Sequence, residues 1–494
     1  MTEKLVTLKV EESHETLSQE QQQALLEKFD IESNQRDPHN FMKYVIYIGL
    51  LMFTLFQLYT AIYGQFPAQI QRTVHLGFAL TFIFLLFPAT RKLNKYSIPF
   101  YDFILAIVAI FVGSYWVLNY ERLVQSLGKL ETMDFYVGLL AIILVLEAAR
   151  RAVGLPIAII AGLFLLYAFF GPYMPDFMAH RGQSIEGIVN LMYYSTDGIL
   201  GTPLSVSATF IFAFLLFGAF LVKTGVGQYF NDLAVSIAGK LVGGPAKVAI
   251  FSSALQGTIS GSSVANVVTS GSYTIPMMKR LGYNKNFAGA VEASASTGGQ
   301  LMPPIMGAAA FLMVEFIGRG ITYWDIAKAA AIPAILYFTG IWIMTHFEAK
   351  RLGLKGLKDE EMPDRKMVFK KIYLLIPIVL IIVLMVTGTP VIRAALYGIL
   401  ACVVVGVINP DVKFGVKDWV EGDLLSLVFR NVNRIDGELM IKDIVMSDNV
   451  GNNISTLGSL TVVPDVDETP VPIPGDANGD GVLTLPSAMM NWLR

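Results

Sequence analysis

Small residues rich in oxygen interrupt a stretch that otherwise has the composition of a membrane helix. Residues 248–278 carry no charge, with Lys247 before them and Lys279 and Arg280 after them. The middle of this stretch, residues 257–263, reads GTISGSS, which forms helix poorly and is rich in hydroxyl groups. Hard cations such as sodium bind oxygen ligands, and carboxylates bind free amide groups at helix N-termini. The stretch therefore offers the chemistry of an ion and anion site.

The length of this stretch predicts its path. One bilayer crossing needs about 20 helical residues, and two crossings with a turn need about 40. Residues 248–278 fit neither length. A helix that enters, turns at mid-depth and returns to the same face fits the length, the break and the basic residues at both ends. Irregular backbone at that depth persists only where protein covers it or it lines a cavity, so we predict a re-entrant hairpin with a binding site at its tip.

A second break follows directly. Residues 286–316 form a crossing that is interrupted by STGGQ at 296–300 and by Pro303 and Pro304. Glycine weakens a helix and proline removes a hydrogen-bond donor. Taken alone, this pattern fits a kinked packing helix equally well. Paired broken segments near the midplane are typical of secondary transporters, so a site is favoured beside the hairpin.

One acidic residue lies inside the second segment. Glu292 precedes Ser296 by about one helical turn, and so it falls within the membrane. An ionisable side chain at that depth is a functional candidate by default. A buried pair with a neighbouring helix is the alternative.

The composition predicts the fold class. The chain has 494 residues, of which 54% are hydrophobic and 15% are charged. Uncharged runs of spanning length recur, so we predict an all-α polytopic membrane protein with about ten transmembrane helices and the re-entrant hairpin. Residues 229–240 are expected to form an interfacial helix, with Asn231 and Asp232 off its apolar face. The crossings are expected at 44–63, 73–90, 102–120, 134–149, 153–173, 198–222, 286–316, 329–347, 372–388 and 391–408.

The charge distribution and the cysteine content limit the membrane orientation and the partners of the chain. Residues 348–371 carry eight Lys and Arg residues, which places this loop inside and the N-terminus in the cytosol by the positive-inside rule. The net charge of −2 argues against a nucleic-acid partner. A single cysteine, Cys402, permits no internal disulfide.

Other classes of function fit less well. An intramembrane serine hydrolase needs a base beside its serine, and only His75 and His346 touch membrane segments, each at an end. We therefore expect no enzyme. A channel would be expected to show a filter or rings of charge, and neither is evident. Another sodium-coupled anion carrier, or a membrane anchor for the C-terminal tail, remains as an alternative.

The tail differs in character from the rest of the chain. Residues 424–494 are polar, with short strand-like pieces and a linker rich in proline and aspartate, so we expect a small irregular or β-rich region. Near its end, three residues have the spacing of a calcium loop whose twelfth position is Ser487 rather than an acid. We predict an incomplete calcium loop at Asp476, Asn478 and Asp480.

The two broken segments also resemble a known family. QGTISGSSVANVVTSGSYTIPMMKRLGY at 256–283 and EASASTGGQLMPP at 292–304 are similar to the fused permease of tripartite ATP-independent periplasmic (TRAP) transporters, of the TAXI type. The resemblance covers about 40–423. It implies a cytosolic segment (1–40), a four-helix scaffold (41–151), the first part of an elevator-type transport domain (152–423) and a tail unrelated to the family (424–494).

The resemblance implies sodium-driven uptake of a small organic anion across a bacterial or archaeal cytoplasmic membrane, with a periplasmic binding protein that delivers the substrate. The family repeats its hairpin and broken helix in inverted form, and this chain does not, so we expect a truncated or chimeric gene product. Carried over by motif, the sodium-site residues are Ser260, Gly261, Ser262 and Ser263, with Asn266 supporting the tip. The expected substrate residues are Ser296, Thr297, Gly298 and Gln300, in a break held open by Pro303 and Pro304.

Overall fold

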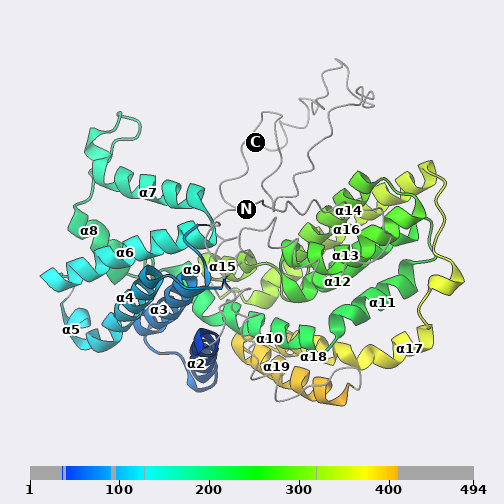
Figure 1. Cartoon of the computed structure of the whole chain (residues 1–494), viewed down its shortest axis with the longest axis horizontal. Helices are drawn as coiled ribbons and strands as arrows, with labels where there is room; N and C mark the ends of the chain where they lie inside the picture. Colours follow the sequence, from blue (N-terminus) through cyan, green and yellow to red (C-terminus); the bar gives the residue numbers. More distant parts are fainter. Residues whose placement is uncertain (1–35, 37–40, 91–95, 127, 319, 410–494) are drawn as a thin grey trace, which may run out of the picture. The chain divides into compact units, whose positions relative to one another are not determined.

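Every regular element in the described part of the chain is a helix. The computed structural model describes residue 36 and residues 41–90, 96–126, 128–318 and 320–409 (Figure 1). The chain divides into two units, residues 1–440 and 441–494, and all described residues belong to the first. The predicted tail, with Asp476, Asn478 and Asp480, and the N-terminal segment apart from residue 36 lie outside the described residues.

Nine helical segments among the described residues are long and apolar enough to cross a membrane, as an all-α polytopic membrane protein requires. The predicted crossing at 286–316 is not one of them, because it is broken into shorter helices. The nine are Phe41–Tyr63 (α2), Ala68–Leu86 (α3), Phe100–Leu118 (α4), Thr132–Ala152 (α6), Leu155–Tyr173 (α7 and a 3-10 turn), Thr202–Lys223 (α9, a π-turn and α10), Tyr323–Arg351 (α16), Asp359–Val386 (α17, α18 and two 3-10 turns) and Val391–Ile408 (α19).

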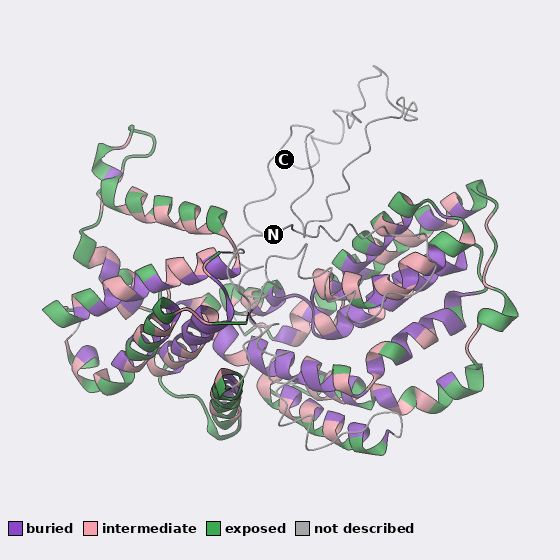
Figure 2. Ribbon diagram, viewed as in Figure 1, coloured by how far each residue is buried: buried purple, intermediate pink, exposed green. Residues whose placement is uncertain are grey.

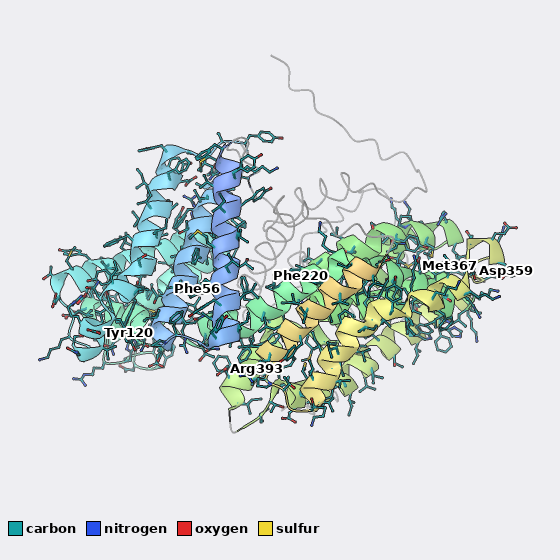
Figure 3. The ribbon with its side chains drawn as sticks, turned by 90° about the horizontal axis from the view of Figure 1, so that it is seen from below. Phe56, Tyr120, Phe220, Asp359, Met367 and Arg393 are labelled. Carbon is teal, nitrogen blue, oxygen red and sulfur yellow. The ribbon has the colours of Figure 1, made fainter. Side chains whose placement is uncertain are left out.

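Many large apolar side chains on these helices are exposed. Figure 2 marks the exposed residues along the ribbon, and Figure 3 draws the side chains that extend from it. The extreme case is α7 (Leu155–Phe170), in which no residue is buried. In water such a surface would drive aggregation, whereas lipid tails solvate it. The exposure pattern is therefore the one expected of helices that face a bilayer.

The first helices pack through small residues and an internal ion network. A Cβ atom built on Gly77 of α3 would lie 2.8 Å from the Cα of Gly113 of α4, so the two backbones touch. Such close approach between membrane helices needs glycine on both sides. Nearby, the carboxylate of Asp102 accepts hydrogen bonds from Arg36 and Arg151, each at 2.6 Å.

The hairpin and the second broken segment form the other structural group of interest. Gly244–Ser260 (α12) packs against Ser263–Leu281 (α13), and Lys285–Gly298 (α14) packs against both (Figure 1). After α14 come a 3-10 turn at Gly299–Leu301 and a short helix at Ala308–Ile317 (α15). Val226–Ala238 (α11) precedes the hairpin and packs on α12.

The helix expected at the interface differs in one respect from the expectation. Tyr229 and Phe230 of α11 are buried as its apolar face predicts, but Asn231, expected to lie off that face, is also buried. Its side-chain oxygen accepts hydrogen bonds from Ser252 and, at 3.0 Å, from Gln256. A polar side chain enters the interior here because α12 supplies donors for it.

Candidate functional site

The stretch 248–278 is two helices rather than one rod. The first half-helix, α12, ends at Ser260, and α13 begins at Ser263. Between them Gly261 has φ +57°, in the left-handed region, and Ser262 is extended. A Cβ atom at Gly261 would lie 2.0 Å from the carbonyl oxygen of Met306, so only glycine fits this turn. The break that the sequence predicted is therefore present, and its unwound part is only two residues long.

Asn266 joins the two half-helices just below the tip. It is 1% exposed, and its side-chain oxygen accepts a hydrogen bond of 2.6 Å from the hydroxyl of Ser260. Its amide nitrogen donates to the backbone carbonyl of Ser253 at 3.4 Å. One side chain on α13 thus contacts both the end and the middle of α12, which is the position expected of a residue that supports the tip.

The two helix ends at the hairpin tip are suited to binding ions. The last carbonyls of α12 and the first amides of α13 have no partners within their own helices. Ser262 caps α13 by accepting the amide hydrogen of Ala265 at 3.3 Å. Carbonyl and hydroxyl oxygens suit a hard cation, and helix N-terminal amides suit an anion.

The second break lies directly against the first. A Cβ atom on Gly257 of α12 would lie 2.2 Å from the Cα of Gly299, in the 3-10 turn after α14. The side-chain amide of Gln300 donates to the hydroxyl of Ser263 at 3.2 Å. The structure therefore brings the hairpin tip and the broken segment together, as paired breaks require.

The two prolines lie in the non-helical stretch between Leu301 and Ala308, as predicted. The hydroxyl of Tyr323, on α16, donates to the carbonyl of Pro304 at 2.9 Å. This contact satisfies a carbonyl that no helix uses, which is how irregular backbone persists among membrane helices.

Three predicted substrate residues have different surroundings. The hydroxyl of Ser296 is fully buried and donates to Glu292 at 3.0 Å. Thr297 is exposed and bonds within its own helix, so it does not join the tip. Gly298 packs under the ring of Tyr337, where a Cβ atom would come within 2.4 Å. Of the second segment's predicted residues, Gln300 makes the direct side-chain contact with the tip.

Glu292 is the centre of a polar cluster that the sequence analysis did not predict. Its side chain is fully buried, and its carboxylate accepts hydrogen bonds from four hydroxyl groups on three helices. The sequence placed Ser296 one helical turn from Glu292, but not the other three partners, because they lie 18 to 39 residues from it along the chain. The partners are Ser253 on α12, Ser270 and Thr274 on α13, and Ser296 on α14.

Both histidines that a hydrolase would need are engaged elsewhere. His75 bonds Gln57 and Ser207 in the interior. His346 accepts from Lys247 at 3.0 Å. Neither bonds Ser260, and the described residues contain no group of three or more metal-ligating side chains.

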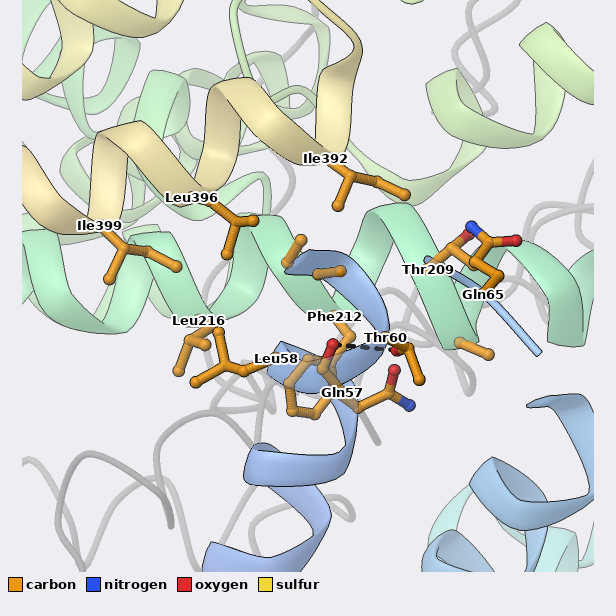
Figure 4. Close-up of a pocket in the computed structure, with 13 residues that line it drawn as sticks. Gln57, Leu58, Thr60, Gln65, Thr209, Phe212, Leu216, Ile392, Leu396 and Ile399 are labelled. Atoms are coloured by element: carbon orange, nitrogen blue, oxygen red, sulfur yellow. Dashed lines mark hydrogen bonds between the residues drawn. The ribbon is translucent and has the colours of Figure 1, made fainter. Parts of the chain in front are cut away.

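A separate cavity lies between α2, Phe212–Lys223 (α10) and α19 and is mostly apolar (Figure 4). Gln57 and Thr60 are its main polar residues on α2, and they bond each other, with the Thr60 hydroxyl donating to the Gln57 carbonyl at 3.0 Å. Its lining includes no residue of the hairpin or of the broken segment. The candidate site is therefore distinct from this cavity.

An apolar helical bundle with two breaks in contact is the architecture of a membrane permease. The model of the family "Tripartite ATP-independent periplasmic transporter, DctM component" matches residues 140–439. This match covers more than half of the chain, and the chain belongs to that family. It is accordingly a multi-pass membrane protein, and the family consists of transporter permeases rather than enzymes. The match begins within α6, so the helices α2, α3 and α4 and the short helix Tyr120–Gln125 (α5) lie outside it.

Individual relatives agree with this assignment. The isethionate TRAP transporter permease DctMQ of Oleidesulfovibrio alaskensis is 27% identical over 44% of this chain and 30% of its own length. The C4-dicarboxylate large permease DctM of Pseudomonas aeruginosa is 32% identical over 24% of this chain and 30% of its own. The sialic acid large permease SiaM of Vibrio cholerae is 27% identical over 34% of this chain and 39% of its own length. The chain thus spans about a third of the length of these curated relatives.

Proposed function

We propose that this chain is a permease component for sodium-coupled uptake of a small organic anion. The observation that carries the proposal is the direct contact between two helix breaks, with Gly257 against Gly299 and Gln300 bonded to Ser263. Helix ends that meet among apolar helices bring carbonyl oxygens and amide groups to one place. A cation and an anion can then be bound together, and neither has to enter the membrane unpaired.

In this proposal sodium is bound at the hairpin tip. Backbone carbonyls near Gly261 and the hydroxyls of Ser260, Ser262 and Ser263 supply hard oxygen ligands. Asn266 holds the tip in shape through its bonds to Ser260 and Ser253. Binding of sodium then fixes the turn that the substrate contacts.

The substrate is proposed to lie between the tip and the broken segment. Gln300 is the best placed of the four predicted residues, while Ser296, Thr297 and Gly298 complete the same segment. The names of the relatives include isethionate, C4-dicarboxylate and sialic acid, which are organic acids. A small organic anion is therefore the proposed class of substrate.

The finer features of the sequence prediction remain part of the proposal. They are the TAXI type, delivery by a periplasmic binding protein, the re-entrant path of the hairpin and elevator-type movement of 152–423 against a 41–151 scaffold. The contact between Gln71 on α3 and the carbonyl of Ala208, at 3.4 Å, supports a packed boundary between these parts. We also propose a bacterial or archaeal cytoplasmic membrane with the N-terminus in the cytosol.

Replacing Ser260 with leucine tests the sodium site. The hydroxyl that bonds Asn266 is lost and a bulky apolar group enters the tip, so sodium-dependent uptake is expected to be abolished. The measurement is uptake of a labelled C4-dicarboxylate in sodium and in choline buffer, by cells that make the chain with its binding protein. Thr269→Leu places the same side chain on an exposed position of α13 and is expected to leave uptake intact. Unchanged sodium-dependent uptake in Ser260→Leu would count against the proposal.

A further inference from the structure

The buried carboxylate of Glu292 has no charged partner in the described part of the chain. Its four bonds all come from neutral hydroxyls. The charged or titratable groups on the three helices that surround it are Lys247, Tyr273, Lys279, Arg280 and Lys285, and none bonds it. The helix α16, which packs on α14, has eight more, and none of these bonds it either: Tyr323, Asp325, Lys328, Tyr337, His346, Glu348, Lys350 and Arg351. Among all of these groups, Lys247 bonds His346 and Tyr337 bonds the carbonyl of Ser294.

A buried charge without a counter-charge is unfavourable. An amide or a hydroxyl in place of Glu292 would link the same three helices without that penalty. The carboxyl group differs from these in one chemical property, which is that it can gain and lose a proton. Its placement therefore needs an explanation beyond packing.

The hydroxyl cage can serve both protonation states. Each hydroxyl has one hydrogen and can also accept a hydrogen bond. Ser270 has a second acceptor in the carbonyl of Asn266 at 2.7 Å, and Thr274 has one in the carbonyl of Ser270 at 3.0 Å. When Glu292 is ionised, these hydroxyls donate to it. When it is protonated, its O–H can donate to one of them, which then turns to its backbone carbonyl.

A proton fits this site better than a metal ion does. Three hydroxyls bond the same carboxylate oxygen, Oε1, directly, from Ser253, Ser270 and Ser296. A cation would have to separate these pairs to reach its usual distance from each oxygen. A proton needs no added space, because it replaces one donor hydrogen in an existing bond.

We propose that Glu292 is a proton-binding site of the transport cycle, so that uptake carries a proton in addition to sodium. The carboxylate takes the proton from the outer solution, becomes neutral and returns the proton to the inner solution. This inference rests on the proposed function for the direction of movement, but the binding of the proton stands on the cage itself.

The bonds around Ser270 connect the proton to the tip. Ser270 lies within hydrogen-bond distance of both Glu292 and the carbonyl of Asn266, and the side chain of Asn266 bonds Ser260. Protonation of Glu292 therefore changes a hydrogen bond on the residue that holds the tip. This gives a direct route from proton binding to the proposed sodium site.

Infrared spectroscopy of the purified full chain tests proton binding without any substrate. The wild-type minus Glu292→Gln difference spectrum is expected to show a protonated carboxyl band that disappears as pH rises. Glu186→Gln, which removes an exposed carboxylate on the short helix Ile185–Val189 (α8), is expected to leave that band in place. Glu292→Asp keeps the acid and is expected to shift the band, which supplies the comparison if the Gln variant does not fold.

Two results would overturn the proposal. One is the absence of the band at every pH at which the chain is folded, since the group would then be permanently ionised. The other is a band that persists over the whole of that range, since the group would never release its proton.

Uptake separates this inference from the proposed function. An inward proton gradient is expected to accelerate sodium-dependent uptake of a labelled C4-dicarboxylate in wild type but not in Glu292→Gln. Sodium-dependent uptake whose rate does not change with the proton gradient would refute proton coupling but not the proposed function. No sodium-dependent uptake by wild type would refute the proposed function, while the infrared result would still decide whether Glu292 binds a proton.

Discussion

Gly257→Ala is expected to destabilise the chain by about 1–3 kcal/mol and to abolish uptake, although alanine favours helix over glycine by about 1 kcal/mol. The new Cβ atom would lie 2.2 Å from the Cα of Gly299 and 2.8 Å from its carbonyl oxygen. Both obstacles are backbone, which cannot rotate away as a flexible side chain would. The hairpin must therefore move off the broken segment, and the two breaks separate.

Gly289→Ala is the matched control, because it makes the same change on a neighbouring helix. Nothing lies within 4 Å of a Cβ atom built on Gly289 of α14. This variant is expected to be neutral or stabilised by up to about 1 kcal/mol. Thermal unfolding in detergent measures both. Similar shifts in the two variants would show that the hairpin does not touch the broken segment as described.

Asp102→Asn is expected to destabilise the chain by about 3–5 kcal/mol, because it leaves the buried guanidinium group of Arg36 without its counter-charge and that of Arg151 with Glu147 alone. The side chains of Arg36 and Asp102 are 0% exposed, and that of Arg151 is 2% exposed. Asparagine keeps the size of aspartate but removes its charge. The loss should appear as a lower unfolding temperature in detergent.

An exposed acid beyond the other end of α4 supplies the control for Asp102. Glu121→Gln, on the short helix Tyr120–Gln125 (α5), also removes one negative charge but does so at the surface. A surface change of this kind is expected to alter stability by less than about 0.5 kcal/mol. If Asp102→Asn behaved like this control, the ion network would be unimportant to the fold.

Local sequence located the hairpin break but not its exact extent. The run 257–263 forms helix poorly by composition, yet α12 continues through Gly257 to Ser260. Gly257 is needed for close packing on Gly299 rather than for a turn. The sequence does not distinguish a glycine needed for close packing from one needed for a turn. Only the tertiary contact shows which role Gly257 has.

Helix periodicity explains why the second segment was predicted only in part. Ser296 and Thr297 are adjacent in sequence, but successive residues on a helix point about 100° apart. Ser296 therefore faces Glu292 while Thr297 is exposed.

The partners of buried polar residues were the least accessible to sequence reasoning. Ser253 lies far from Glu292 along the chain, and Asn231 on α11 bonds Gln256 on α12 across a turn. No local pattern marks such pairs. Two features were nevertheless available, the hydroxyls of Ser270 and Thr274 one turn apart on α13 and the acid within an apolar segment.

A sodium site where the two helix breaks meet is tested most directly by comparing the unfolding temperature of the chain in sodium chloride with that in potassium chloride at equal concentration. A ligand that binds only the folded state adds about 1.4 kcal/mol of stability at ten times its dissociation constant. We therefore predict a higher unfolding temperature in sodium, and loss of that difference in Ser260→Leu but not in Thr269→Leu. Equal unfolding temperatures of the wild-type chain in the two salts, over the whole concentration range, would contradict the account.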